Sequence, residues 1–189
     1  VYELFLGVFI FDLFMQQVEK WGDWYLFDPH EVKKVLGFSL EDFYDKEKWD
    51  GKSPLDPDRH AFSYHYFKAV DNNDLHLKKR LPAIEIMKKI MRSQLETGLP
   101  YMFYRDTANR DNPNNHAGMV YCSNLCSEIV QNQSPTIMTK ETINELGEII
   151  VHKQSGDFVT CNLSSIVLNN VLKDFTLSIE GPQTSDDVK

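Results

Sequence analysis

The regular spacing of apolar residues between Leu81 and Glu96, and its abrupt end, constrains the fold more than any other feature. Apolar side chains recur there at intervals of three and four residues, which is the spacing of one face of an α-helix. Gly98 and Pro100 follow, as is typical where a helix ends. The next stretches are short, apolar or alternating, and separated by polar turns, which is typical of strands. The sequence therefore predicts a mixed α/β fold.

The first half of the chain is predicted to be mainly helical. Val1–Val18 is dense in apolar residues, and Pro29–Leu36 has a proline at its start and Gly37 after its end, which favours a short helix. Ser39–Asp42 resembles an imperfect capping box and predicts the start of a second short helix. Asp45–His60 is charged and contains glycine and prolines, so we expect a surface loop.

The second half is predicted to alternate short strands with turns. Strands are expected at Tyr101–Tyr104, Gly118–Tyr121, Glu128–Gln131, Glu148–His152 and Asp157–Leu163. Thr139–Leu146 is expected to form a helical turn or two, and Ser164–Leu172 another helix. Gly181–Lys189 has few residues that can pack and is expected to be a flexible tail.

Length, charge and cysteine content limit the classes of function. A chain of 189 residues forms one substantial domain, or one with a small addition. The net charge of −8 argues against a nucleic-acid or membrane partner, since both favour basic surfaces. No apolar run approaches the roughly 20 residues of a membrane span, and Tyr2–Phe14 lacks the basic start of a signal peptide. The three cysteines are therefore expected to be reduced thiols in the cytoplasm.

A thiol, an amide and a carboxylate occur at alternate positions in Asn124, Cys126 and Glu128. In extended backbone, such spacing places all three side chains on the same side, where they can face one small substrate. Each residue also has a simpler interpretation. Cys126 can be a small buried apolar residue, Glu128 a solvated strand carboxylate, and Asn124 a turn residue that bonds its own backbone.

This pattern and several other stretches resemble the large (alpha) subunit of class I ribonucleotide reductases, which convert ribonucleoside diphosphates to deoxyribonucleotides. The similar stretches occur in the order of the family, up to about Leu172. They are Asp12–Met15, Asp23–Val32, Gln94–Tyr101, Phe103–Arg110, Ser123–Ile129 and Cys161–Ser165.

The resemblance implies the first part of a ten-stranded α/β barrel, built from two five-stranded halves, with the reactive cysteine on a loop inside. We therefore expect a mainly helical segment at residues 1–97, a partial barrel at 98–180 and a flexible tail at 181–189. Family members are several times longer, so the chain is expected to be a fragment, a split subunit or a truncated form. The sequence does not decide among these, and it leaves oligomeric state and allosteric regulation open.

The resemblance also assigns roles to individual residues. Cys126 matches the cysteine that becomes a thiyl radical and removes the hydrogen from C3′ of the ribose. Glu128 matches the carboxylate that takes the proton from the 3′-hydroxyl, and Asn124 matches the amide that holds the ribose hydroxyls. Cys161 matches one of two redox-active cysteines, whose natural partner precedes the part represented here. Cys122 is an addition to the family pattern and is interpreted as structural.

The implied cofactors and partners are external to the chain. The radical would come from the metal centre of a separate small subunit, and the electrons from a dithiol reductant of the thioredoxin or glutaredoxin type. No metal site is expected in the chain itself, because its six histidines lack ligand spacing. Expected partners are a ribonucleoside diphosphate, the remaining large-subunit sequence and the small subunit.

The alternative is a non-catalytic interaction or remnant fragment that keeps the fold. The family's later tyrosine pair, phosphate-binding loop and C-terminal shuttle cysteines have no counterpart here, so the chain alone is expected to be inactive.

Overall fold

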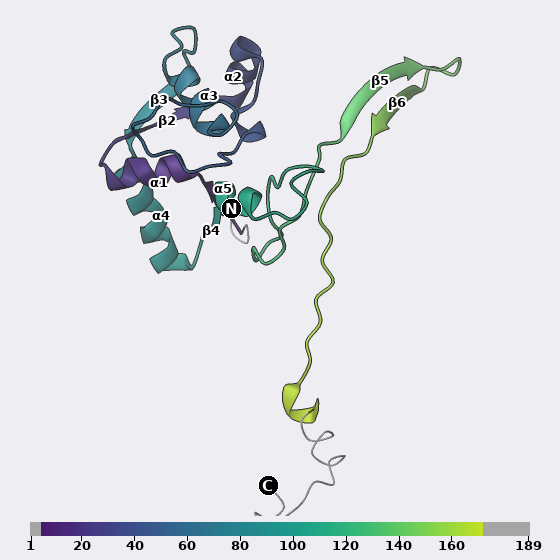
Figure 1. The fold of residues 1–189 in the computed structure, drawn as a ribbon. Coiled ribbons are helices and arrows are strands. Elements are labelled where there is room, and N and C mark those ends of the chain that lie inside the picture. The colour runs from purple at the N-terminus through teal and green to yellow at the C-terminus, as the bar shows by residue number, and fades with distance from the viewer. Residues whose placement is uncertain (1–4, 172–189) are drawn as a thin grey trace, which may run out of the picture.

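The computed structural model describes residues 5–171, which form a mixed α/β fold of short elements (Figure 1). This confirms the mixed α/β class expected from the sequence. In chain order, the elements are β1 (Gly7–Ile10), α1 (Asp12–Glu19), β2 (Asp23–Phe27), α2 (Pro29–Leu36), the 3-10 helix η1 (Leu40–Asp42), α3 (Ala61–Val70), β3 (Lys78–Pro82), α4 (Ala83–Thr97), β4 (Tyr101–Tyr104), α5 (Arg105–Arg110), β5 (Ile137–Ile143) and β6 (Ile149–Gln154).

The strands of the described part form three separate pairs. β1 runs parallel to β4, with Gly7 opposite Tyr101 and Ile10 opposite Tyr104. β2 pairs with β3, and β5 with β6, both antiparallel. Parallel strands need a long crossover connection, and the whole segment from α1 to α4 lies between β1 and β4. Within residues 5–171 these pairs do not close into the expected ten-stranded barrel.

The first half is less helical than expected, because it contains strands β1, β2 and β3. The apolar run predicted as helical at Val1–Val18 is divided: Gly7–Ile10 is a strand, and the helix begins only after Phe11, whose backbone is extended. A short apolar run does not distinguish a buried strand from a buried helix. Strand β1 depends on a partner, β4, that lies far along the chain, and no local pattern shows that pairing.

The helices with clear end signals agree with the sequence. α2 spans Pro29–Leu36 as predicted: Asp28 accepts a hydrogen bond from the Glu31 N–H at 2.8 Å, and Gly37 ends the helix with a φ of 79°. Such a positive φ favours glycine because it has no Cβ. The helix expected from Leu81 begins at Ala83, because Leu81 pairs with Trp24 in the β2–β3 sheet.

The segment between α2 and α3 differs from the prediction in two ways. Ser39 makes no capping hydrogen bond, and the expected second helix is only the 3-10 helix η1. The loop expected at Asp45–His60 is present, but its two end residues form a bridge and are both buried. The loop is therefore anchored to the body at both ends.

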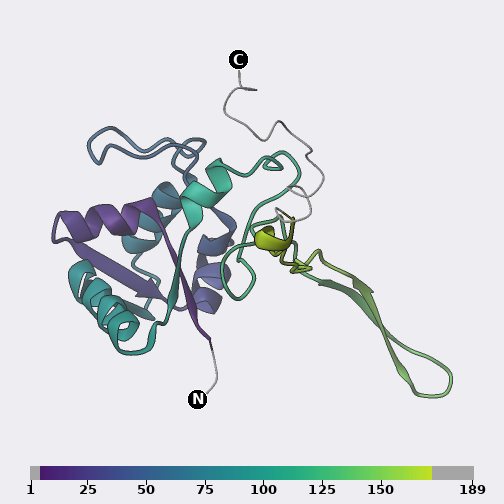
Figure 2. The same cartoon turned by 90° about the horizontal axis from the view of Figure 1, so that it is seen from below.

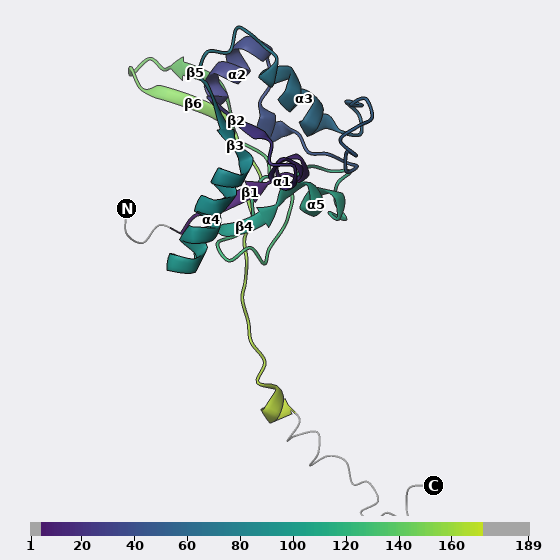
Figure 3. The same ribbon diagram turned by 90° about the vertical axis from the view of Figure 1, so that its left-hand side faces the viewer.

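The apolar core lies in the part of the chain before residue 121. Trp24 links two of its clusters, with its ring 4.3 Å from that of Tyr66 and 5.2 Å from that of Phe14. A third cluster joins α2 to α3 through Val32 and Ala69. Helix α1 packs against α4 beside the β1–β4 pair, as Figure 3 shows.

Strand predictions in the second half are correct only where a partner strand is present. β4 matches the expected Tyr101–Tyr104, and β6 covers most of the expected Glu148–His152. The expected strands at Gly118–Tyr121 and Glu128–Gln131 are reduced to single bridges, and Asp157–Leu163 contains no strand.

The helical turn predicted at Thr139–Leu146 is wrong, because β5 occupies Ile137–Ile143 and forms a hairpin with β6. The turn of the hairpin explains the difference. Asn144 accepts hydrogen bonds from the N–H groups of Leu146 and Glu148 at 3.0 and 2.9 Å, and Gly147 has a φ of 78°. These are the features of a tight turn.

The hairpin extends away from the body (Figures 1 and 2), and the segment that follows it leads away in Figures 1 and 3. A helical turn at 168–171 corresponds to part of the helix predicted at Ser164–Leu172. Leu172 and the predicted flexible tail at 181–189 lie outside the described residues.

Candidate active site

The predicted site residues Asn124, Cys126 and Glu128 lie on a loop that folds back on itself. Two bridges hold its sides together, Met119 with Gln133 and Ser123 with Val130. Helix α5 leads into this loop, and β5 follows it. The loop therefore connects the β1–β4 pair to the projecting hairpin (Figure 1).

The tip of the loop is a turn, which corrects the extended geometry predicted for Asn124–Glu128. The Ser127 N–H donates to the Asn124 carbonyl at 3.2 Å, and Ser127 has a φ of 68°. The Asn124 side chain accepts from the Ile129 N–H at 3.0 Å. Asparagine and serine favour turns because their side chains bond nearby backbone groups, so the polar composition that suggests a substrate contact also bends the chain.

The turn exposes the thiol and the carboxylate to solvent. Cys126 and Glu128 are exposed, and Asn124 is half-buried. The interpretation of Cys126 as a small buried apolar residue therefore does not describe its position. Glu128 is solvated, as its simpler interpretation stated, but it lies in the loop and not in a strand. Asn124 bonds its own backbone, as its simpler interpretation stated.

A cavity of about 180 Å³ lies beside the turn. Its wall includes Asn124 and Ser127 from the loop, and aromatic residues of the first sheet such as Phe9 and Phe103. Cys126 and Glu128 are not among its lining residues. The cavity thus joins the loop to the β1–β4 pair, with an amide at the loop side of its wall.

Cys161 lies on the stretch that follows β6. Asp157, four residues earlier, still accepts from the Ser134 hydroxyl at 2.9 Å, after which the chain leads away from the body (Figures 1 and 3). Cys161 is half-buried with a free thiol. Within residues 5–171, no hydrogen bond or disulfide joins it to the loop that carries Cys126.

Side-chain amides of asparagines bond the loop to α5 and to the residues just after this helix. Asn109 is 1% exposed, accepts from the Val120 N–H at 2.8 Å and donates to the Val120 carbonyl at 3.0 Å. Asn132 accepts from Asn112 at 2.6 Å and donates to the Asn114 carbonyl at 2.7 Å. None of these residues was among the site residues predicted from the sequence.

A signal for them was nevertheless present in the sequence. Asparagine and glutamine are concentrated between residues 109 and 133, on both sides of Cys126. A loop so rich in amides needs hydrogen-bond partners wherever it is buried.

Buried carboxylates anchor the start of α5. Asp106 is 0% exposed and accepts from the N–H groups of Asp12 and Asp45 at 2.7 and 2.8 Å. Burial, as the largest cause, raises the pKa of Asp106 to about 6. Burial also raises the pKa of Asp45, which accepts a hydrogen bond from the Ser63 N–H. Arg110 forms an ion pair with Asp12 at 2.9 Å. These bonds join α1, α3 and α5.

Arg105 is the buried cation of this region. Its guanidinium donates to the Glu41 and Tyr121 carbonyls and lies 5.7 Å from the Phe11 ring centre and 5.3 Å from that of Tyr121. Burial lowers the pKa of Arg105. Arg105 also lines a cavity of about 290 Å³ whose wall is largely aromatic and includes Trp24. No residue of the loop that carries Cys126 lines this cavity.

Two classes of site were sought in the described residues. Among residues 5–171, no group of three or more histidine, cysteine, aspartate or glutamate side chains is placed to hold a metal ion. In the same range, no helix is both long and apolar enough to cross a bilayer.

Comparison with known proteins gives one consistent family. The family described as the ribonucleotide reductase barrel domain matches residues 1–187. The ribonucleoside-diphosphate reductase subunit alpha of Treponema pallidum is 40% identical over 176 residues, covering 90% of this chain and 19% of that protein. The corresponding subunit of Synechocystis is 35% identical over 134 residues, covering 71% of this chain and 16% of that protein.

A eukaryotic relative shows the same relationship. The ribonucleoside-diphosphate reductase large chain of Schizosaccharomyces pombe is 29% identical over 175 residues, covering 91% of this chain and 16% of that protein. The chain thus spans less than a fifth of the length of these relatives. The near-complete family match and these identities show that the chain belongs to the ribonucleotide reductase barrel-domain family of enzymes.

Proposed function

We propose that this chain is a segment of a ribonucleoside-diphosphate reductase large subunit that carries the reactive cysteine loop. The observation that carries the proposal is the turn at Asn124–Ser127. It exposes the Cys126 thiol and the Glu128 carboxylate beside a cavity whose wall includes Asn124. The family match over residues 1–187 supports the same function.

In the proposed reaction, each residue has a separate task. Cys126, as a thiyl radical, takes the hydrogen atom from C3′ of the ribose and returns it at the end. Glu128 accepts the proton of the 3′-hydroxyl, for which an ionised carboxylate within hydrogen-bond reach is required. Asn124 holds the ribose hydroxyls. Cys161 and a second cysteine outside this chain supply two electrons and become a disulfide, so the hydroxyl lost from the substrate leaves as water.

The proposal requires components that this chain does not supply. A separate small subunit would generate the radical with its metal centre, and a dithiol reductant of the thioredoxin or glutaredoxin type would reduce the disulfide. Cys161 must also come within roughly 4–7 Å of its partner cysteine, measured between α-carbons. The remaining large-subunit sequence would bring these groups together.

The test is complementation. The chain is produced together with the remaining large-subunit sequence of its source, supplied with a small subunit, a dithiol reductant and a ribonucleoside diphosphate, and deoxyribonucleotide is measured. We expect activity with the complemented chain, none above background with the chain alone, and none with Cys126→Ser, because an alcohol O–H bond is too strong to replace the thiol.

The control is Cys122→Ser, which alters another exposed thiol of the same loop and should retain activity. If Cys126→Ser kept turnover, the assignment of Cys126 would be wrong.

A non-catalytic interaction fragment is the second candidate. The observation that favours it is the exposure of apolar side chains along the hairpin and the stretch after it, including Ile143, Leu146, Phe158 and Leu163. A complex with the remaining large-subunit sequence that forms normally but gives no product would support this second function.

A further inference from the structure

The side chain of Gln133 makes three hydrogen bonds to a single residue, Cys122. Its Oε1 accepts from the Cys122 N–H at 2.9 Å and from the Cys122 thiol at 3.2 Å. Its Nε2 donates to the Cys122 carbonyl at 3.1 Å. The amide of Gln133 therefore satisfies both backbone groups of Cys122 and its thiol.

Gln133 and Cys122 lie on opposite sides of the cysteine loop. Cys122 is four residues before Cys126, on the side that enters the turn, and Gln133 is on the side that leaves it. The Gln133 N–H also donates to the Met119 carbonyl at 3.0 Å. The backbone and the side chain of one residue thus hold the two sides of the loop together.

Apolar packing supports this loop only in part, since Met119, Tyr121 and Ile129 are half-buried. Between residues 118 and 133, Val120 is the sole buried apolar residue of the described chain, and Asn109 holds it on the side away from the turn. Beyond Val120, the position of the turn depends on hydrogen bonds across the loop. A bond network in a loop without a packed core is sensitive to the loss of one member.

We propose that Gln133 is the positioning residue for the Cys126 turn, acting through Cys122. This rests on the proposed function of Cys126, but the mechanical role of Gln133 is independent of it. An amide is required because the task needs an acceptor for the Cys122 N–H and thiol and a donor for the Cys122 carbonyl. A carboxylate of the same size supplies only the acceptor, and leucine supplies neither.

The reactivity of each thiol towards iodoacetamide tests this role in the full chain without requiring turnover. Mass spectrometry would follow alkylation of Cys122, Cys126 and Cys161 separately. In Gln133→Leu, we expect Cys122, whose thiol donates to Gln133, to react about fivefold faster, the factor that corresponds to ~1 kcal/mol of lost hydrogen bonding. The Cys126 thiol is already exposed, so we expect its rate to change as the turn that carries it loses its fixed position. Cys161 lies on another segment and should keep its rate.

The variants Gln133→Glu and Gln131→Leu complete the experiment. Gln133→Glu has the same size and retains the acceptor, so we expect an intermediate increase at Cys122 and an intermediate change at Cys126. Gln131 is exposed on the same loop, and Gln131→Leu should leave all three rates unchanged. Circular dichroism and the fluorescence of the half-buried Trp24, which packs against the core, would verify that each variant folds.

Two outcomes would overturn the proposal: unchanged rates at Cys126 in both Gln133 variants, or the same acceleration in Gln131→Leu. A higher alkylation rate at Cys122 with an unchanged rate at Cys126 is one form of the first outcome. It would show that Gln133 holds Cys122 but does not position the turn. The complementation test of Cys126 measures deoxyribonucleotide and does not depend on these alkylation rates. Failure of one proposal can therefore be distinguished from failure of the other.

Discussion

Asp106 is a charged group in a place that favours its neutral form. It is fully buried at the start of α5, and both of its oxygens accept backbone hydrogen bonds, from Asp12 and Asp45. These bonds favour the carboxylate, but burial outweighs them and raises its pKa to about 6 from an ordinary 3.8. The negative charges of Asp45 and Asp12 act in the same direction. The ionised form is therefore present at neutral pH at a cost in stability.

The raised pKa of Asp106 predicts the direction of one pH dependence. Between about pH 4 and 6 the folded state binds a proton at Asp106 that the unfolded state has released. The free energy of unfolding contributed by this group is therefore highest near pH 4 and falls as the pH rises through 6. A difference between 3.8 and about 6 corresponds to about 3 kcal/mol in total, of which about 2 kcal/mol should appear in urea unfolding from pH 4.5 to 7.5.

Comparison with Asp106→Asn isolates this contribution from that of the other carboxyl groups. The variant cannot ionise, so its unfolding free energy should fall less across the same pH range, although it loses one acceptor for the two N–H groups. Asp111→Asn, at an exposed position just after α5, should retain the pH dependence of the original chain. An identical pH profile for Asp106→Asn and the original chain would contradict the assignment.

At the scale of elements, helices and strands were predicted correctly from the sequence where residues at their own ends determine where they begin and end. α2 has a proline at its start, the Asp28 cap before it and Gly37 after it, so its bounds agree with the sequence. β1 and β2 were missed because their partners, β4 and β3, are distant in sequence and their own apolar runs fit either a strand or a helix. β5 was predicted as a helical turn. Its polar and charged residues are also common in helices, and its strand conformation depends on pairing with β6.

The sequence predicted which residues belong to the candidate site, but not the backbone conformation that carries them. The spacing of Asn124, Cys126 and Glu128 and the family resemblance selected the loop, but the expected extended backbone was wrong because Asn124 bonds the Ile129 N–H. Gln133 acts on Cys122 from across the loop. Its role depends on how the loop folds back, which sequence spacing does not show.

The cap of α2 gives a prediction at this scale. Asp28→Ala removes the acceptor of the Glu31 N–H, so the free energy of unfolding should fall by about 1 kcal/mol. The loss has a wider effect, because the Glu31 carboxylate accepts from the N–H groups of His76 and Leu77, which lead into β3. Chemical denaturation measures the change, and Asp28→Ser, which retains a capping oxygen, should restore most of it. Equal losses in both variants would show that the cap is not the cause.

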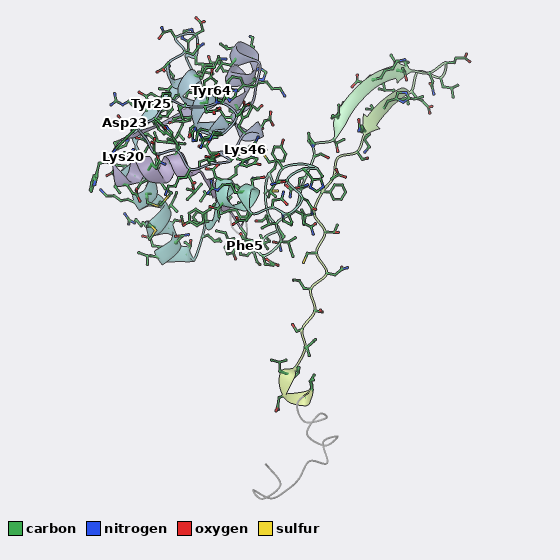
Figure 4. All side chains as sticks on the ribbon, in the orientation of Figure 1. Phe5, Lys20, Asp23, Tyr25, Lys46 and Tyr64 are labelled. Atoms are coloured by element: carbon green, nitrogen blue, oxygen red, sulfur yellow. The ribbon has the colours of Figure 1, made fainter. Side chains whose placement is uncertain are left out.

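The whole molecule has an uneven distribution of apolar surface. Within residues 5–171, the buried apolar residues all occur up to Val120, whereas the hairpin and the following stretch expose theirs. Figure 4 shows side chains along this stretch without other described chain beside them. A two-stranded hairpin without a covering layer is only marginally stable in water. Under the proposed function, the remaining large-subunit sequence would supply that layer.

We therefore expect the isolated chain to associate with itself as its concentration rises. Ile143 and Ile149 face each other across the hairpin and are 74% and 69% exposed, and unpaired strand edges beside apolar side chains promote association. Replacing both with threonine keeps the β-branched shape suited to a strand and removes apolar surface, so it should weaken association. The control Leu95→Gln removes an exposed leucine from α4 and should not. Sedimentation velocity across a concentration series distinguishes these cases, and a monomer at every concentration would mean that the chain covers its own apolar surface in solution.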